Sequence, residues 1–387
     1  MPLARRAVLR ALPLPLLPLL WAPLAACGAP AAAGDAAEGE IRRAVARWSA
    51  APPAALAGIP LEDWAYEVTS VRREGAAAFA RAELRYRLAG YDTAPSGSAR
   101  EVELVRDGAA WRVTGDRPAP GALPQLWDQG PVAVARGAHS LVLGAGGQER
   151  NLAGIAAEAD RAVAAVTAAW PQRWAGRVVV LVPGTLDAMA ALLGRPAADY
   201  RGLGAVTTGR VGAGPAPADR VVVNPEGYAE LSEEGRRIVL AHETTHVATR
   251  AATSPQTPLW LSEGFADWAA YRGTGRTAAE AAPELARAVR RGELPGALPA
   301  DEAFGFGGDP EALARAYGGA WLACRLIADR WGEAALVRLY ERAGREPLPT
   351  ALPATLALDP AALTRAWRTY LTEQLNPEAV PSGRPRS

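Results

Sequence analysis

Two short motifs within residues 238–271 constrain the fold more than any other feature of this chain. The first reads His-Glu-Thr-Thr-His and runs from His242 to His246. On an α-helix, positions four apart lie on the same face, so both imidazoles can point at one metal ion. Glu243 follows the first histidine and would stand beside that ion, where a metal-activated water needs a general base. The motif therefore predicts a helix with a metal site on one face.

The second motif reads Trp-Leu-Ser-Glu-Gly-Phe-Ala-Asp-Trp and runs from Trp260 to Trp268. Its two carboxylates, Glu263 and Asp267, are also four positions apart, so both can lie on one face of a second helix. Glu263 is therefore a candidate third ligand. Asp267 is a candidate acceptor for the outer ring N–H of a ligating histidine, a common arrangement at metal sites.

The alternative is an amphipathic helix with two polar residues on its outer face. The chain has only three histidines among 387 residues, so a pair at this spacing beside a glutamate is improbable by chance. The first motif is also flanked by apolar residues, namely Ile238, Val239, Leu240, Ala241, Val247 and Ala248. Histidines in such surroundings need polar partners, which a metal ion supplies. Both observations favour the metal site.

These motifs resemble the gluzincin metallopeptidases, the class that includes thermolysin and aminopeptidase N. The Trp-Leu-x-Glu-Gly-x-Ala pattern of the second motif is most similar to the bacterial peptidase MA-like group. The resemblance implies one zinc ion bound by His242, His246 and Glu263, with Glu243 as general base. The 16 residues between His246 and Glu263 (263 − 246 − 1) make a slightly shorter gap than in aminopeptidase N, so the connecting loop must differ. The resemblance covers residues 135–375 and is specific only at the two motifs.

Two further assignments rest on the same resemblance. In gluzincins a strand beside the active site pairs with the substrate backbone, and Gly204, Ala205 and Val206 stand where that strand would be; an ordinary core hairpin is the alternative. Tyr317 resembles the helix tyrosine whose hydroxyl stabilises the oxyanion in aminopeptidase N-like enzymes; a packed helix tyrosine is the alternative. His139 heads a predicted strand far from the motifs and is not expected to be a ligand.

The first 27 residues have the features of an export signal. Arg5, Arg6 and Arg10 form a basic start, and an apolar stretch follows. The sequence Leu-Ala-Ala-Cys-Gly then resembles a bacterial lipobox, in which Cys27 becomes the lipidated first residue. An ordinary signal peptide with an incidental cysteine is the alternative. The resemblance implies an exported bacterial lipoprotein on the outer face of the cytoplasmic membrane, tethered to the membrane through Cys27.

Composition limits the class of protein further. A hydrophobic content of 49% with 21% charged residues indicates a globular chain, and 387 residues leave room for two or three domains. The net charge of +1 gives no reason to expect a nucleic-acid partner. The second cysteine, Cys324, lies in an apolar helical run and is expected to be a buried residue without a disulfide.

Hydrophobic periodicity divides the chain into two folded parts and predicts the α+β class. Residues 37–117 begin with a helix and continue with four alternating segments, a pattern that resembles a small cystatin-like domain of the nuclear-transport-factor type with an antiparallel sheet. Residues 135–375 fit a gluzincin-type domain with a mixed-sheet amino lobe and a helical carboxyl lobe. The other segments are the leader at 1–27, a tether at 28–36, a proline-rich linker at 118–134 and a disordered tail at 376–387.

Some elements of the second part are predicted in more detail. One helix is expected over residues 278–291, and another begins at Pro310 with Asp309 as its cap. The glycine- and proline-rich segment 211–218 is expected to be a flexible loop at the rim of the cleft.

The predicted function is zinc-dependent hydrolysis of peptide bonds by a metal-activated water, with a peptide or protein as substrate. Two alternatives from other classes stay open. A peptidase-like domain without activity would serve as a metal-bearing binding or scaffold lipoprotein at the cell surface. In the other alternative, the helix binds no metal at all. The amino-terminal domain carries no cluster of catalytic groups and is interpreted as a spacer or interaction module.

Overall fold

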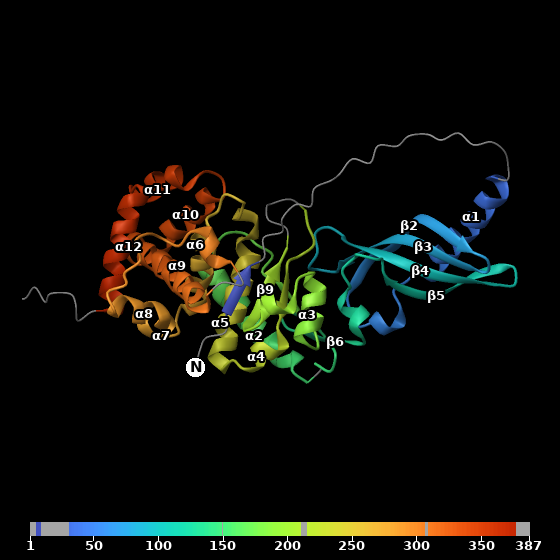
Figure 1. The fold of residues 1–387 in the computed structure, drawn as a ribbon, viewed down its shortest axis with the longest axis horizontal. Helices are drawn as coiled ribbons and strands as arrows, with labels where there is room; N and C mark the ends of the chain where they lie inside the picture. Colours follow the sequence, from blue (N-terminus) through green and yellow to red (C-terminus); the bar gives the residue numbers. More distant parts are fainter. Residues whose placement is uncertain (1–4, 9–30, 149, 210–214, 306–308, 377–387) are drawn as a thin grey trace, which may run out of the picture.

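The computed structural model describes residues 5–8, 31–148, 150–209, 215–305 and 309–376, and for residues 5–8 and 31–35 it describes the backbone alone. The described chain is elongated (Figure 1). A four-stranded antiparallel sheet lies at one end, a six-stranded mixed sheet in the middle and a helical lobe at the other end. The α+β class expected from the sequence is therefore confirmed.

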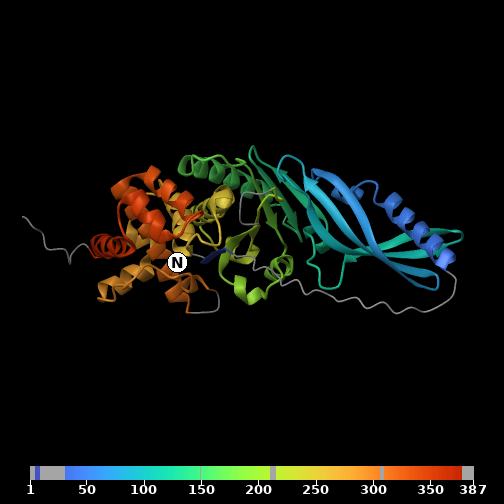
Figure 2. The same ribbon diagram turned by 90° about the horizontal axis from the view of Figure 1, so that it is seen from above.

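The amino-terminal part is a helix packed along an antiparallel sheet (Figure 2), as the alternating segments predicted. The sheet has the order β2-β3-β4-β5, formed by β2 (Leu61–Glu74), β3 (Ala77–Leu88), β4 (Ser96–Asp107) and β5 (Ala110–Pro118). Buried alanines of β3 face α1 (Ala31–Trp48), where Ile41 and Val45 fill the space between helix and sheet. Helix α1 begins inside the expected tether, because alanines there have a high helix propensity.

The middle sheet has the order β1-β9-β10-β8-β7-β6, with β7 parallel to β8 and β9 antiparallel to β10. Its strands are β1 (Arg5–Val8), β6 (Val132–Arg136), β7 (Ser140–Ala145), β8 (Val178–Val182), β9 (Leu203–Thr208) and β10 (Arg220–Val223). One face packs on α2 (Leu152–Ala169) and α5 (Glu233–Thr249), and the other face packs on α3 (Leu186–Leu193). Consecutive residues of each strand therefore contribute to opposite layers.

The helical lobe is built around α9 (Pro310–Trp331), which packs on α6 (Leu259–Tyr271). Asp309 caps α9 as predicted, and its carboxylate accepts hydrogen bonds from the first turn. The remaining helices of the described chain are α4 (Pro225–Ala229), α7 (Ala278–Ala281), α8 (Pro283–Arg290), α10 (Glu333–Ala343), α11 (Leu348–Leu356) and α12 (Pro360–Leu375). Cys324 is fully buried, as expected, and forms no disulfide with any described residue.

The expectation of one helix over 278–291 is wrong, because the structure breaks it into α7 and α8 at Ala282. Pro283 lacks an N–H and disfavours helical backbone in the residue before it, and Ala282 accordingly adopts φ −128° and ψ 62°. Strand β6 begins inside the segment expected to be linker and ends two residues beyond it, at Arg136. Helix α11 includes Pro353.

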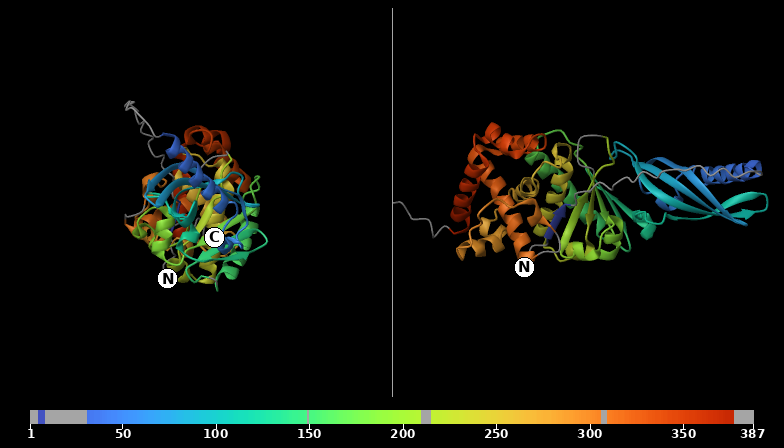
Figure 3. Two further views of the ribbon diagram at one scale, coloured as in Figure 1. Left: turned by 90° about the vertical axis from the view of Figure 1, so that its right-hand side faces the viewer. Right: turned by 45° about the horizontal axis from the view of Figure 1, so that its top comes forward.

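Strand β1 comes from the leader, which is expected to lie outside the fold. It runs parallel to β9, from Arg5 opposite Leu203 to Val8 opposite Thr207, and is the blue strand in the middle of the right-hand view of Figure 3. An unpaired β9 would expose a row of backbone donors and acceptors, which this pairing satisfies. The edge of β9 that was expected to be open is therefore paired with residues 5–8 in the described chain.

Three expected features fall wholly or partly outside the described residues and stay predictions. They are the lipidation site at Cys27, the rim loop at 211–218 (of which 211–214 are not described) and the disordered tail at 376–387 (of which 377–387 are not described). In the part of the chain that the structure describes, no helix combines the length and the apolar character needed to cross a membrane.

Candidate metal centre

Helix α5 begins at Glu233, directly after its cap residue Ser232. The side chain of Ser232 accepts a hydrogen bond from the N–H of Gly235 at 3.1 Å, and two glutamates in the first turn favour the positive end of the helix. From Ile238 onward most of its residues are buried, because β9, α2 and α6 pack around it. The first motif is therefore placed in the interior and away from solvent.

Helix α6 carries the second motif and is held close to α9 by its glycine. A Cβ added to Gly264 would lie 2.2 Å from the carbonyl oxygen of Ala320, so the two helices touch backbone to backbone. With Gly264 facing α9, Glu263 and Asp267 face α5 and reach the histidines there. This contact explains why the motif contains a glycine directly after the glutamate.

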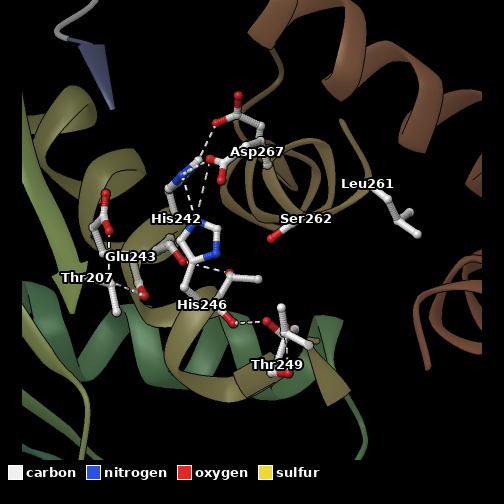
Figure 4. Close-up of polar contacts among 12 residues, drawn as sticks. Thr207, His242, Glu243, His246, Thr249, Leu261, Ser262 and Asp267 are labelled. Carbon is white, nitrogen blue, oxygen red and sulfur yellow. Dashed lines mark hydrogen bonds and ion pairs between the residues drawn. The ribbon is translucent and has the colours of Figure 1, made fainter. Parts of the chain in front are cut away.

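Three side chains converge between α5 and α6, and Figure 4 shows the two histidines among them. The Nε2 atoms of His242 and His246 are 3.1 Å apart. Oε2 of Glu263 lies 3.3 Å from Nε2 of His242 and 3.6 Å from Nε2 of His246. All three residues are buried, and the most exposed of them, His246, is 3% exposed. The structure thus brings together the three residues that the sequence indicates as ligands.

Asp267 lies behind His242 (Figure 4). Its Oδ1 is 2.8 Å from Nδ1 of His242. We assign the proton of this hydrogen bond to Nδ1, because the carboxylate can only accept. The lone pair of Nε2 then faces the other two candidate ligands. Asp267 therefore fixes both the tautomer and the orientation of the ring, as the spacing of the second motif suggests.

Three carboxyl groups are buried at the site. Glu243, Glu263 and Asp267 are 0%, 1% and 5% exposed. Burial opposes the charged form of His242, but Asp267, Glu263 and Glu243 outweigh this effect and raise its pKa to about 9. Burial also opposes ionisation of Glu263, yet the two neighbouring imidazoles lower its pKa to about 2. Buried carboxylates that stay ionised require a compensating positive charge.

A zinc ion fits this set of ligands. Tetrahedral zinc with Zn–N bonds of about 2.05 Å separates two nitrogens by about 3.3 Å, close to the 3.1 Å between the two Nε2 atoms. Oε2 of Glu263 is buried and accepts no hydrogen bond from any described residue, so a cation would satisfy it. Two imidazoles and one carboxylate leave a fourth position for water or substrate, which is the pattern of catalytic rather than structural zinc.

Glu243 lies beside the ligands and contacts Thr207 of β9 (Figure 4). Oγ1 of Thr207 is 2.7 Å from Oε2 of Glu243 and 3.0 Å from its backbone oxygen. Thr207 is fully buried. The sequence reasoning missed this residue. The available signal was the first of the two threonines that end this otherwise apolar strand, two positions after Ala205 and so on the same face.

The other candidate residues are placed as follows. Tyr317 lies on α9, with its ring centroid 6.4 Å from that of His242 and 5.3 Å from that of Phe304. It is therefore next to the candidate metal ligands and also packed against an aromatic neighbour. Gly204, Ala205 and Val206 lie in β9, directly before Thr207. His139 is exposed just before β7 and does not belong to the buried group of three candidate ligands.

No protein-family model matches this chain, and no curated protein sequence matches it. Solved structures of M1 zinc metallopeptidases, which are of the gluzincin type, resemble it. The enzyme from Deinococcus radiodurans is 16% identical with a TM-score of 0.36, and the match covers 79% of this chain and 63% of that one. Yeast LTA4 hydrolase is 12% identical with a TM-score of 0.39, over 73% of this chain and 45% of that one. This chain spans less than two thirds of either protein, and at these scores the likeness carries no argument about its activity.

Proposed function

We propose that this chain is a zinc-dependent peptidase. The observation that carries the proposal is the buried group of His242, His246 and Glu263 with the carboxylate of Glu243 beside it. Without a cation, burying such a group costs free energy that apolar side chains of similar size would not cost. Buried ionisable clusters of this kind are typical of sites where chemistry takes place.

Different residues of the site are proposed to bind the metal and to transfer the proton. Zinc, when held by His242, His246 and Glu263, supplies a Lewis acid that polarises a peptide carbonyl and lowers the pKa of a water molecule. The carboxylate of Glu243 takes a proton from the water as the oxygen of the water bonds to the carbonyl carbon. It then passes this proton to the leaving amine nitrogen as the C–N bond breaks. Thr207 holds that carboxylate in place.

Strand β9 is the proposed binding site for the substrate backbone. An extended peptide would add a strand along Gly204, Ala205 and Val206, as peptides do at exposed sheet edges. Residues 5–8 occupy this edge in the described chain. A chain that begins after the leader should therefore cleave peptides faster than the full chain.

The test is incubation of the purified protein with a mixed peptide library, with and without a metal chelator. The proposal expects cleavage products that disappear with the chelator and return when zinc is added back. If metal analysis finds zinc but no peptide is cleaved, the protein is a binding module. If the protein binds no zinc, both the metal site and the peptidase activity are excluded.

Removal of the Thr207 hydroxyl should slow the reaction without affecting metal binding. Thr207→Val is expected to lower kcat by about 10- to 100-fold, the equivalent of the roughly 1.5–3 kcal/mol of a hydrogen bond to a charged group. Thr207→Ser keeps the hydroxyl and should retain most of the activity. Steady-state kinetics and zinc analysis check this result. Equal kcat values for the two variants would exclude the positioning role.

The proposed oxyanion role of Tyr317 is tested by Tyr317→Phe, which removes only the hydroxyl. Loss of one oxyanion donor typically lowers kcat by about 10²- to 10³-fold, and we expect a loss in this range with little change in KM. The packing against Phe304 is kept in this variant. Unchanged kcat would assign Tyr317 to packing alone.

A further inference from the structure

The amino-terminal sheet is connected to the metal site through two consecutive residues at the start of β10. Asp219 pairs with Arg250, just beyond α5, with 2.6 Å between Nε and Oδ2. Arg220 pairs with Asp92 in the connection between β3 and β4, with 2.9 Å between Nη1 and Oδ1. None of the four side chains is more than 14% exposed. Asp219 directly precedes β10, which begins at Arg220. Because side chains alternate along extended backbone, the two pairs point to opposite faces of the sheet.

Asp92 is tightly constrained by both parts of the molecule. Its Oδ1 accepts a hydrogen bond from the N–H of Ala218 at 2.8 Å, and its Oδ2 accepts one from the N–H of Leu88 at 2.7 Å. The guanidinium of Arg220 donates to Oδ2 as well, at 3.0 Å. Beside it, the hydroxyl of Thr93 donates to the carbonyl of Ala216 at 2.8 Å. A fully buried carboxylate with this set of donors tolerates little displacement, because each lost bond leaves charge unsolvated.

The position of β10 in turn affects β9, the strand that carries Thr207. Arg220 is opposite Thr208 in the antiparallel pairing, and Val221 is opposite Thr207. A shift at the start of β10 would therefore move Thr207 relative to Glu243. On the other face of the sheet, Arg250 stands four positions after His246, so its pair with Asp219 connects β10 to the end of the helix that carries the ligands.

Among the described residues, the apolar cluster that joins the two parts contains no residue of β10, and only Ala218 just before this strand packs against it. The apolar contacts between the two parts join residues such as Leu88 and Leu126 to Leu141 of β7 and Val179 of β8. At β10 there is a cavity of about 660 Å³ instead, lined by polar and apolar residues that include Arg220. Close packing normally fixes the position of neighbouring elements. Beside this cavity the polar contacts of Asp92 and Thr93 have that role.

We propose that the amino-terminal domain positions the catalytic residues, with Asp92 acting through Arg220 and β10 on Thr207 and thereby on Glu243. This proposal rests on the proposed peptidase function. Asp92 touches neither the candidate ligands nor the general base, so it is a positioning residue. The domain is then part of the catalytic unit, in contrast to its interpretation as a spacer.

The test compares Asp92→Asn with Arg177→Gln in the full chain. Arg177 donates a hydrogen bond to the carbonyl of Gly90 at 3.2 Å. This control therefore removes a hydrogen bond between the β3–β4 connection and the residue directly before β8, and it leaves β10 unchanged. For each variant, kcat, KM and zinc content are measured, together with hydrogen exchange of the amides in β9 and β10.

We expect Asp92→Asn to lower kcat about tenfold, with less change in KM, unchanged zinc content and faster exchange in β9 and β10. Arg177→Gln should match the wild type in both measurements. Asp92→Asn combined with Arg220→Gln should lose no more activity than either single variant, because both act through one contact. If Asp92→Asn does not fold, Thr93→Val, at an exposed position, should give a smaller loss of the same kind.

A merely structural role would lower the melting temperature but leave kcat per folded molecule unchanged. That result would overturn the proposal, as would an equal loss of kcat in Arg177→Gln. Hydrogen exchange separates this proposal from the proposed function. If the wild type cleaves no peptide, faster exchange in β9 confined to the Asp92 variant still supports the positioning, and unchanged exchange overturns it.

Discussion

Glu243→Gln is expected to lower the rate of peptide hydrolysis by about 10²- to 10⁴-fold, the range that a positioned general base contributes. Glutamine has nearly the same shape and can keep the contact with Thr207, but its amide cannot take a proton from water. Glu243 is not among the three candidate ligands, so zinc content should stay near one per chain. Single-turnover kinetics and metal analysis on the same protein measure both quantities.

Glu234→Gln is the matched control for this experiment. Glu234 lies in the first turn of the same helix and pairs with Arg276 at the surface, so its replacement changes the charge of α5 without reaching the metal site. It should retain the activity of the wild type. A Glu243→Gln protein with near-normal turnover would refute the role of Glu243 as general base.

Glu263→Gln is expected to remove zinc binding and activity together. Loss of a residue that only orients a ligand costs about 10- to 100-fold in metal affinity, so loss of a charged ligand should cost more. The loss of zinc binding also changes the free energy of unfolding, because a ligand at 1,000 times its Kd stabilises the folded state by about 4 kcal/mol. Zinc should therefore raise the melting temperature of the wild type and have little effect on the variant.

Glu158→Gln serves as a control matched for burial. Glu158 is 8% exposed and pairs with Arg161 on α2, outside the candidate site. This variant should keep the full zinc-dependent rise in melting temperature. If Glu263→Gln kept it as well, the third ligand would have to be another residue, and the assignment of the second motif would be wrong.

The sequence by itself determined the elements that depend on local patterns. The i, i+4 spacing in each motif predicted two helices, and the structure has them as α5 and α6. The alternation that predicted the antiparallel sheet is equally local, and its four segments are the strands β2 to β5. Periodicity of this kind is visible without knowing the neighbours, because it reflects which face of one element is buried. The break at Ala282 was also readable from Pro283 and was overlooked.

The tertiary structure alone decided which distant residues meet. Thr207 reaches Glu243 across 36 positions, and Asp92 reaches Arg220 across 128. It also decided that Arg5–Val8 occupies the edge of β9, which no pattern in the leader indicates. Such contacts depend on how separate elements pack against one another. The type of one residue does not indicate which distant residue it will contact. For this reason the sequence predicted the three candidate metal ligands, while the hydroxyl beside the general base and the connection to the amino-terminal domain became visible only in the fold.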